Sequence, residues 1–119
     1  MDNWRMAKKQ IPASVGLAAI ENRELPTATR YLLQEIEKRH PGGSVELRVP
    51  PFGAIQCIEG MDHRRGTPPN VVELSAEVFL DLCLGESSWE AAVASGVISA
   101  SGAKASEVAT VFPLSLSVS

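Results

Sequence analysis

The fold class follows from Ser44-Val45-Glu46-Leu47-Arg48-Val49-Pro50-Pro51-Phe52-Gly53-Ala54-Ile55-Gln56-Cys57-Ile58-Glu59. At its start, Val45, Leu47 and Val49 alternate with polar residues, and this period of two predicts a half-buried strand. The adjacent prolines Pro50 and Pro51 must turn the chain, because neither can donate to a central strand ladder. Apolar residues after the turn predict a second strand over residues 54–59, with both of its faces covered.

Helical patterns precede this pair of strands. A weakly patterned apolar run over residues 15–20 predicts a short helix that ends near Asn22. From Thr29 to His40, apolar residues recur at three- and four-residue spacing and predict a helix over residues 27–39. Pro41, Gly42 and Gly43 then end it.

A mixture of short elements follows the strands. We expect a third strand over residues 70–74, then a helix that begins after the N-cap Ser75 and ends at Gly85. A capping box over residues 87–90 predicts a second short helix up to Gly96. The remaining elements are a strand over 97–101, a helix over 108–112, and an alternating tail over 114–119 that fits a strand or a frayed terminus.

The order of these elements predicts an α+β fold. Short links between the first three strands favour an antiparallel meander, within a largely antiparallel sheet of about five strands with helices packed on one face. On the covered side of the sheet we expect Val45, Leu47, Val49, Ile55, Val72, Leu74, Ile98 and Ala100. Above them we expect Leu32, Leu33, Ile36, Phe79, Leu82 and Trp89.

Composition and charge fit one globular domain and exclude several classes of function. The chain has 119 residues, of which 45% are hydrophobic and 21% charged, so it is long and apolar enough to form a sizeable core. A net charge of −3 and scattered basic residues argue against nucleic acid. No secretory signal or apolar run of membrane-spanning length is found, so we expect a cytoplasmic protein without an integral membrane segment. Cys57 and Cys83 lie in apolar runs and fit buried thiols in a reducing compartment.

Residue types that carry catalysis are sparse. His40 and His63 belong to no metal-ligand spacing, so no metal and no cofactor is expected. Cys57 and His63 could form a nucleophile and base, but a thiol within an apolar strand has a raised pKa and reacts slowly. Glu59 and Asp62 could act as an acid–base pair, yet they are better placed to neutralise the arginines that follow. We therefore expect no enzyme activity.

Two features remain as candidate binding sites. The loop His63-Arg64-Arg65-Gly66-Thr67-Pro68-Pro69-Asn70 is stiffened by its prolines, so the Arg65 guanidinium can meet a carboxylate or phosphate. The same loop also fits a stiff solvated connection. Large apolar residues on the short helices fit ordinary core packing, or a roof that leaves an apolar cavity over the sheet. That cavity would be bounded by Phe79, Leu82, Cys83, Trp89, Val93 and Phe112.

Two blocks of the chain resemble the sterol carrier protein family. In residues 88–102 and 111–114, a short helix, a glycine turn, an alternating strand closed by glycine, and a helix with an apolar end follow one another. The middle block is more distinctive, and with Val49-Pro50-Pro51-Phe52-Gly53 and Arg65-Gly66-Thr67-Pro68-Pro69-Asn70 it is similar to a bacterial, chiefly actinobacterial, branch. The resemblance covers residues 25–114.

The residues before the resemblance predict a leader with a short helix over residues 1–24, and the resemblance implies a sterol-carrier-like domain over residues 25–119. It implies a non-enzymatic lipid-binding or lipid-transfer domain, whose apolar tunnel holds a fatty acyl chain or a sterol-like lipid, with Arg65 at the ligand's polar end. Ala103 stands where the family often has Asp, and serines replace charged outward residues in the last strand. The ligand's identity and the oligomeric state therefore stay open.

Two other functions stay open as well. One is a protein-interaction module that binds no lipid. The other is an accessory part of an enzyme, because the C-terminal domain of mycothiol-dependent maleylpyruvate isomerases also has a sterol-carrier-like fold. The metal of that enzyme belongs to another domain, so isomerase activity of this chain alone is not expected.

Overall fold

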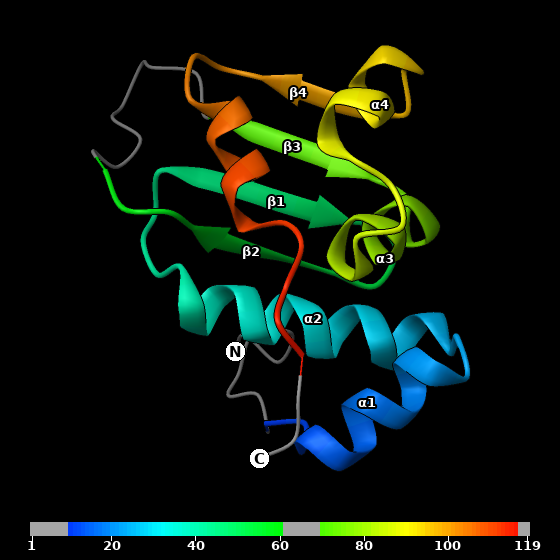
Figure 1. Cartoon of the computed structure of the whole chain (residues 1–119). Helices are drawn as coiled ribbons and strands as arrows, with labels where there is room; N and C mark the ends of the chain where they lie inside the picture. Colours follow the sequence, from blue (N-terminus) through cyan, green and yellow to red (C-terminus); the bar gives the residue numbers. More distant parts are fainter. Residues whose placement is uncertain (1–9, 61–69, 117–119) are drawn as a thin grey trace.

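The structure is a computed structural model that describes residues 10–60 and 70–116 (Figure 1). In chain order its elements are α1 (Ala13–Glu21), α2 (Leu25–Arg39), β1 (Val45–Val49), β2 (Gly53–Cys57), β3 (Val71–Leu74), α3 (Ala76–Leu84), α4 (Trp89–Ala94), β4 (Ile98–Ser101) and the 3₁₀ helix η1 (Ala105–Val111). The α+β class is confirmed. Among the described residues, no helix is long and apolar enough to cross a membrane.

The sheet is mixed, with its strands in the order β2-β1-β3-β4. β1 pairs antiparallel with β2 and parallel with β3, and β3 pairs antiparallel with β4. The sheet is therefore largely antiparallel as expected, but the predicted meander of the first three strands is wrong. The connection over residues 58–70 is long enough to bring β3 to the other side of β1, where the two strands run parallel.

Residues 114–116, the described part of the tail that was a candidate for a further strand, cross the helices instead (Figure 1). The Leu114 amide donates to the Cys83 carbonyl of α3 at 2.9 Å, and Arg39 of α2 donates from Nη1 to the Ser115 carbonyl at 2.8 Å. In the described part of the chain the sheet has four strands, one fewer than expected.

Helices cover one face of the sheet and leave the other open. The covered face holds fully buried apolar side chains, among them Val45, Leu47 and Val72. Apart from the half-buried Val71, the open face presents short or polar side chains: Glu46, Arg48, Ala54, Gln56, Glu73, Ser99 and Ser101. The expectation that both faces of β2 are covered is therefore wrong, since Ala54 and Gln56 offer little apolar area to a second layer.

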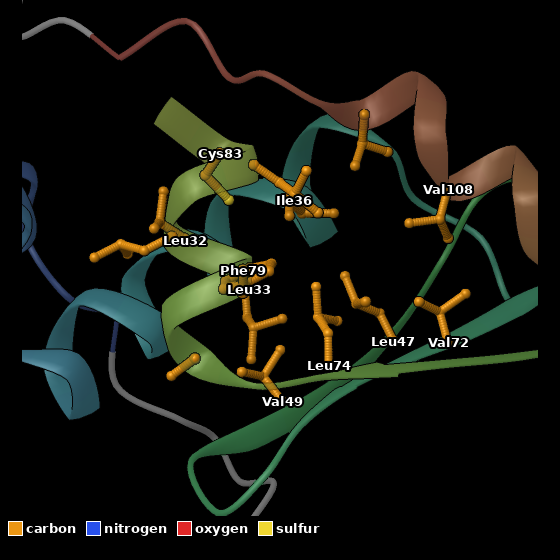
Figure 2. Packing of buried hydrophobic residues seen from close by; sticks show 14 of the residues in the cluster. Leu32, Leu33, Ile36, Leu47, Val49, Val72, Leu74, Phe79, Cys83 and Val108 are labelled. Carbon is orange, nitrogen blue, oxygen red and sulfur yellow. The ribbon is translucent and has the colours of Figure 1, made fainter. Parts of the chain in front are cut away.

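The core lies between the sheet and the helices α2, α3 and η1. Figure 2 shows Leu32, Ile36 and Phe79 on the helix side, across from Leu47 and Val49 on the strands. All five side chains are fully buried. This arrangement confirms the predicted packing at the centre of the sheet.

Coverage weakens toward the β4 edge. Ala100 pairs with Val72, so it shares the covered side of the sheet by register, yet Ala100 is exposed and Ile98 is half-buried. Including Ala100 in the packed core is therefore wrong, because η1 contacts the edge strand without burying Ala100. Strand alternation identifies a face, but it does not give the width of the layer above it.

α1 packs on α2 through a contact between a glycine and a tyrosine. A β-carbon on Gly16 would overlap the ring of Tyr31, which is buried. Before α1, the Gln34 side chain forms two hydrogen bonds with the backbone of Ile11, one as acceptor and one as donor. The Ile11 amide donates to Gln34 Oε1 at 2.8 Å, and Gln34 Nε2 donates to the Ile11 carbonyl at 3.0 Å.

Asn70 joins three segments at the start of β3. Its Nδ2 donates to the Ser44 carbonyl at 2.8 Å, its Oδ1 accepts from the Lys104 amide at 3.0 Å, and its carbonyl accepts from the Glu46 amide at 2.8 Å. Gly102 lies against this side chain at a φ of 100°, and a β-carbon there would overlap Asn70. The glycine that closes the last strand is therefore required by the Asn70 contact as well as by its own backbone.

Candidate functional site

A surface hollow of about 430 Å³ lies where α3, α4 and the end of η1 meet. It is lined by the run from Gly85 to Glu90 together with Leu82, Ala109, Phe112 and Pro113. Its volume lies within the range of small-molecule binding sites. Apolar and aromatic side chains form one part of its wall, and the polar turn between α3 and α4 forms the other.

The turn between α3 and α4 is fixed at both of its ends. α3 ends at Gly85, which adopts the left-handed conformation with φ 76°, and the Glu86 amide donates back to the Asp81 carbonyl at 2.8 Å. Ser88 is the N-cap of α4, and its Oγ accepts from the Ala91 amide at 3.1 Å. The predicted capping box is wrong in its register, because Glu90 follows the actual cap by two positions rather than three.

Phe112 is the central aromatic residue of the hollow. Its ring lies nearly parallel to that of Trp89, with centroids 6.4 Å apart and an angle of 17° between the planes. On the core side it meets the buried Phe79 edge-on, at 6.2 Å and 83°. Because the amide of Leu114, two residues further on, is hydrogen-bonded to α3, the chain on the C-terminal side of Phe112 is held in place.

The rim of the hollow carries negative charge. Glu86 and Glu90 are exposed, and both line the hollow. Arg23, in the turn after α1, contacts Glu86 at 3.6 Å and Asp81 at 3.2 Å. All three of these side chains are substantially exposed, so their ion pairs contribute little to stability.

The structure brings together three of the residues predicted to bound a cavity. Leu82, Trp89 and Phe112 line the hollow, although the Leu82 side chain is itself almost fully buried. Phe79 and Cys83 are fully buried in the core behind it. The sixth, Val93, is 48% exposed and does not line this hollow. Arg65, the predicted contact for an anion, falls outside the described residues.

Several residues of the hollow were missed by reasoning from the sequence. Pro113 belongs to a tail that had no predictable partner, so no local pattern placed it beside Gly85. Glu90 had a signal, because it follows Trp89 directly and opens the same short helix. The sequence pattern places its charge in a helix cap, and the structure places it on the rim.

The cysteines give the site no nucleophile. Burial is the main cause that raises the pKa of Cys57 to about 11, and Glu37 adds to the shift. Burial also raises the pKa of Cys83. The predicted rise in the Cys57 pKa is confirmed, and both thiols are protonated at neutral pH. Among the described residues, no group of three or more His, Cys, Asp or Glu side chains could hold a metal ion.

Comparison with known proteins now adds to this geometry. A search of curated proteins found no match to the chain. A scan against protein-family models matched residues 21–114 to the family described as bacterial SCP ortholog, where SCP denotes sterol carrier protein. The match extends from the end of α1 to the tail beyond Phe112 and includes every residue that lines the hollow. The chain therefore belongs to the bacterial orthologues of sterol carrier proteins.

Proposed function

We propose that the protein is a carrier domain that binds an apolar or amphipathic ligand, such as a fatty acyl chain or a sterol-like lipid, without catalysis of its own. The observation that carries this proposal is the hollow between α3, α4 and η1, with Trp89 and Phe112 in its wall. Family membership supports it, because the family's name denotes carriers of lipid.

Burial of the ligand's apolar surface would drive binding. Each buried CH₂ group contributes about 0.8 kcal/mol, so a chain of several carbons binds without any reactive group. Pro113 is exposed and supplies an aliphatic contact, Leu82 closes the wall from the core side, and the two aromatic rings supply broad flat surfaces. Phe79 and Cys83 would support the wall from behind. Arg65 remains a proposed contact for an anionic partner or ligand group.

The proposal includes a cytoplasmic location. Cys57 and Cys83 are both free and buried. Free thiols of this kind are stable in a reducing compartment. A transfer role would also require the ligand to leave the hollow, which is open to solvent on the side of the acidic rim.

Native mass spectrometry of the purified protein tests the proposal. A lipid that co-purifies and is released on denaturation supports it, and Trp89→Ala should reduce the bound fraction. Val93→Ala is the matched control, since Val93 lies on the same helix but outside the hollow. Thermal melting of both variants shows whether a loss of ligand reflects unfolding. Clean apo protein that also takes up no added alkyl amphiphile would refute the carrier function.

A second candidate function is a protein-interaction module. It is favoured by two large apolar side chains exposed beside the β4 edge, Val93 at 48% and Val97 at 45%. Exposed apolar residues next to a sheet edge provide a surface for another chain. Analytical ultracentrifugation separates the two functions. A complex that Val97→Asp dissociates, in protein free of lipid, would favour the interaction module.

A further inference from the structure

The charged side chains that line the hollow are all negative among the described residues. Glu86 and Glu90 line it, and no Lys, Arg or His is among the described residues that do so. Among the described residues, Arg23 contacts the rim, and its guanidinium is shared between Glu86 and Asp81. One guanidinium therefore faces two carboxylates, and Glu90 adds a third negative charge at the opening. A free carboxylate that entered the hollow would meet this rim unfavourably.

The α4 N-terminus offers no compensation for an anion. α4 has 6 residues, and its first turn contains Glu90. The Ala91 amide is already taken by the Ser88 hydroxyl. An anionic group placed near this turn would therefore find a neighbouring carboxylate and a donor that is already occupied.

The aromatic wall favours the opposite charge. Trp89 is half-buried, and its ring lies almost parallel to that of Phe112. The negative face of an aromatic ring attracts a cation within about 6 Å of its centre, and Trp is the strongest such partner. A quaternary ammonium group also carries apolar methyl groups, so it can contact the exposed Pro113 without leaving an unpaired N–H donor.

We propose that this hollow selects amphiphiles with a quaternary ammonium head group and rejects those with a free carboxylate. The inference rests on the proposed function, because it assigns head-group chemistry to the same hollow. The ammonium lies against Trp89 and Phe112 with Glu86 and Glu90 around it, and the alkyl chain follows the apolar side of the wall. We expect a preference on the order of tenfold over a carboxylate of equal chain length.

Binding of three matched probes tests this inference. The probes are decyltrimethylammonium, decanoate and a neutral decyl glycoside, each below its micelle-forming concentration. The sequence contains 2 tryptophans, so the Trp4→Phe background leaves Trp89 as a single fluorescent reporter in the hollow. We expect the ammonium probe to bind most tightly, the glycoside to be intermediate and decanoate to be weakest.

Charge variants separate local selection from attraction by the whole protein. Glu86→Gln with Glu90→Gln should reduce the preference for ammonium over decanoate to about twofold or less. The control is Glu37→Gln with Glu73→Gln, which changes the net charge equally at exposed positions outside the hollow. The control should keep the full preference. A further variant is Trp89→Leu, whose binding is measured by calorimetry. It should still bind the glycoside but no longer prefer the ammonium probe over decanoate.

The outcomes distinguish the two proposals. Decanoate binding as tightly as the ammonium probe would overturn the head-group inference and leave the carrier function intact. An equal loss of preference in the rim and control variants would overturn it too, because it would show attraction to net charge alone. Failure of all three probes to bind would refute the carrier function itself.

Discussion

Replacing Thr29 with valine should make the protein more stable. Thr29 lies on the buried face of α2, and within the described residues its Oγ1 is a buried polar atom without a hydrogen-bond partner. A buried hydroxyl in that state costs about 1–3 kcal/mol of unfolding free energy, because it has lost its bonds to water. Valine keeps the shape and the β-branching, so packing and helix propensity change little.

We expect Thr29→Val to raise the unfolding free energy by about 1–2 kcal/mol. For a domain of this size each kcal/mol corresponds to about 4 °C, so the Tm should rise by about 4–8 °C. Urea unfolding followed by circular dichroism measures the free energy, and calorimetry measures the Tm. The control is Thr27→Val, which makes the same change on a half-buried side chain of the same helix and should shift the Tm little.

A third variant makes this reasoning refutable. Thr29→Ser keeps the hydroxyl and removes a buried methyl group, so it should destabilise by about 1 kcal/mol. If Thr29→Val is no more stable than the natural protein while Thr29→Ser is destabilised, the hydroxyl has a partner after all. A bound water at Thr29 would be the first explanation to examine.

Three other predictions concern the contacts that hold the fold. Gly16→Ala should destabilise by about 1–3 kcal/mol in urea unfolding, because the new methyl group overlaps the Tyr31 ring; an unchanged midpoint would contradict the α1–α2 contact. Asn70→Asp should cost about 1–3 kcal/mol, since it replaces the donor to the Ser44 carbonyl with a second acceptor; unchanged stability would show that this hydrogen bond is dispensable. Alkylation of native Cys57 should be slow at pH 8 and its rate should rise up to about pH 11, whereas fast alkylation with its half-maximal rate at about pH 8.5 would show an accessible, normal thiol.

The same pKa shift has a consequence for stability at high pH. The folded protein holds the Cys57 proton more tightly than the unfolded chain, because the pKa rises to about 11 on burial. Below the pKa of the unfolded thiol both states keep the proton, so this group does not change the unfolding free energy with pH. As the pH rises from that value through about 11, the unfolded state loses its proton first and stability falls.

Local patterns predicted most of the elements because each depends on neighbouring residues. The alternation from Val45 to Val49 and the Ser75 cap with its closing Gly85 lie where they were expected. Strand order depends on contacts between segments that are far apart in the sequence, and no short stretch of residues contains that information. β1 can accept a partner on either side, and only the packing of the whole chain decides that β2 and β3 lie on opposite sides of it.

The candidate site was predictable in part for the same reason. Leu82 and Trp89 are close in sequence and belong to helices with readable boundaries, so their proximity followed from the short turn between them. Phe112 was predictable only with the help of the resemblance to sterol carrier proteins. In the structure its ring packs against Phe79, which belongs to a different helix. Pro113 depends on the path of the tail across α3, which no periodicity encodes.

The position of Ser44 has a consequence for how this protein can diversify. Its amide and hydroxyl both donate to the Ile58 carbonyl, and its own carbonyl accepts from Asn70, so the chain on both sides of residues 59–69 is fastened to one residue. Doubling the length of a connection whose ends are fixed costs only about 0.6 kcal/mol of closure entropy. Insertions between these anchor points should therefore leave the sheet register intact. Natural variation or a grafted peptide can change the chemistry carried there, including that of Arg65, at small cost to folding.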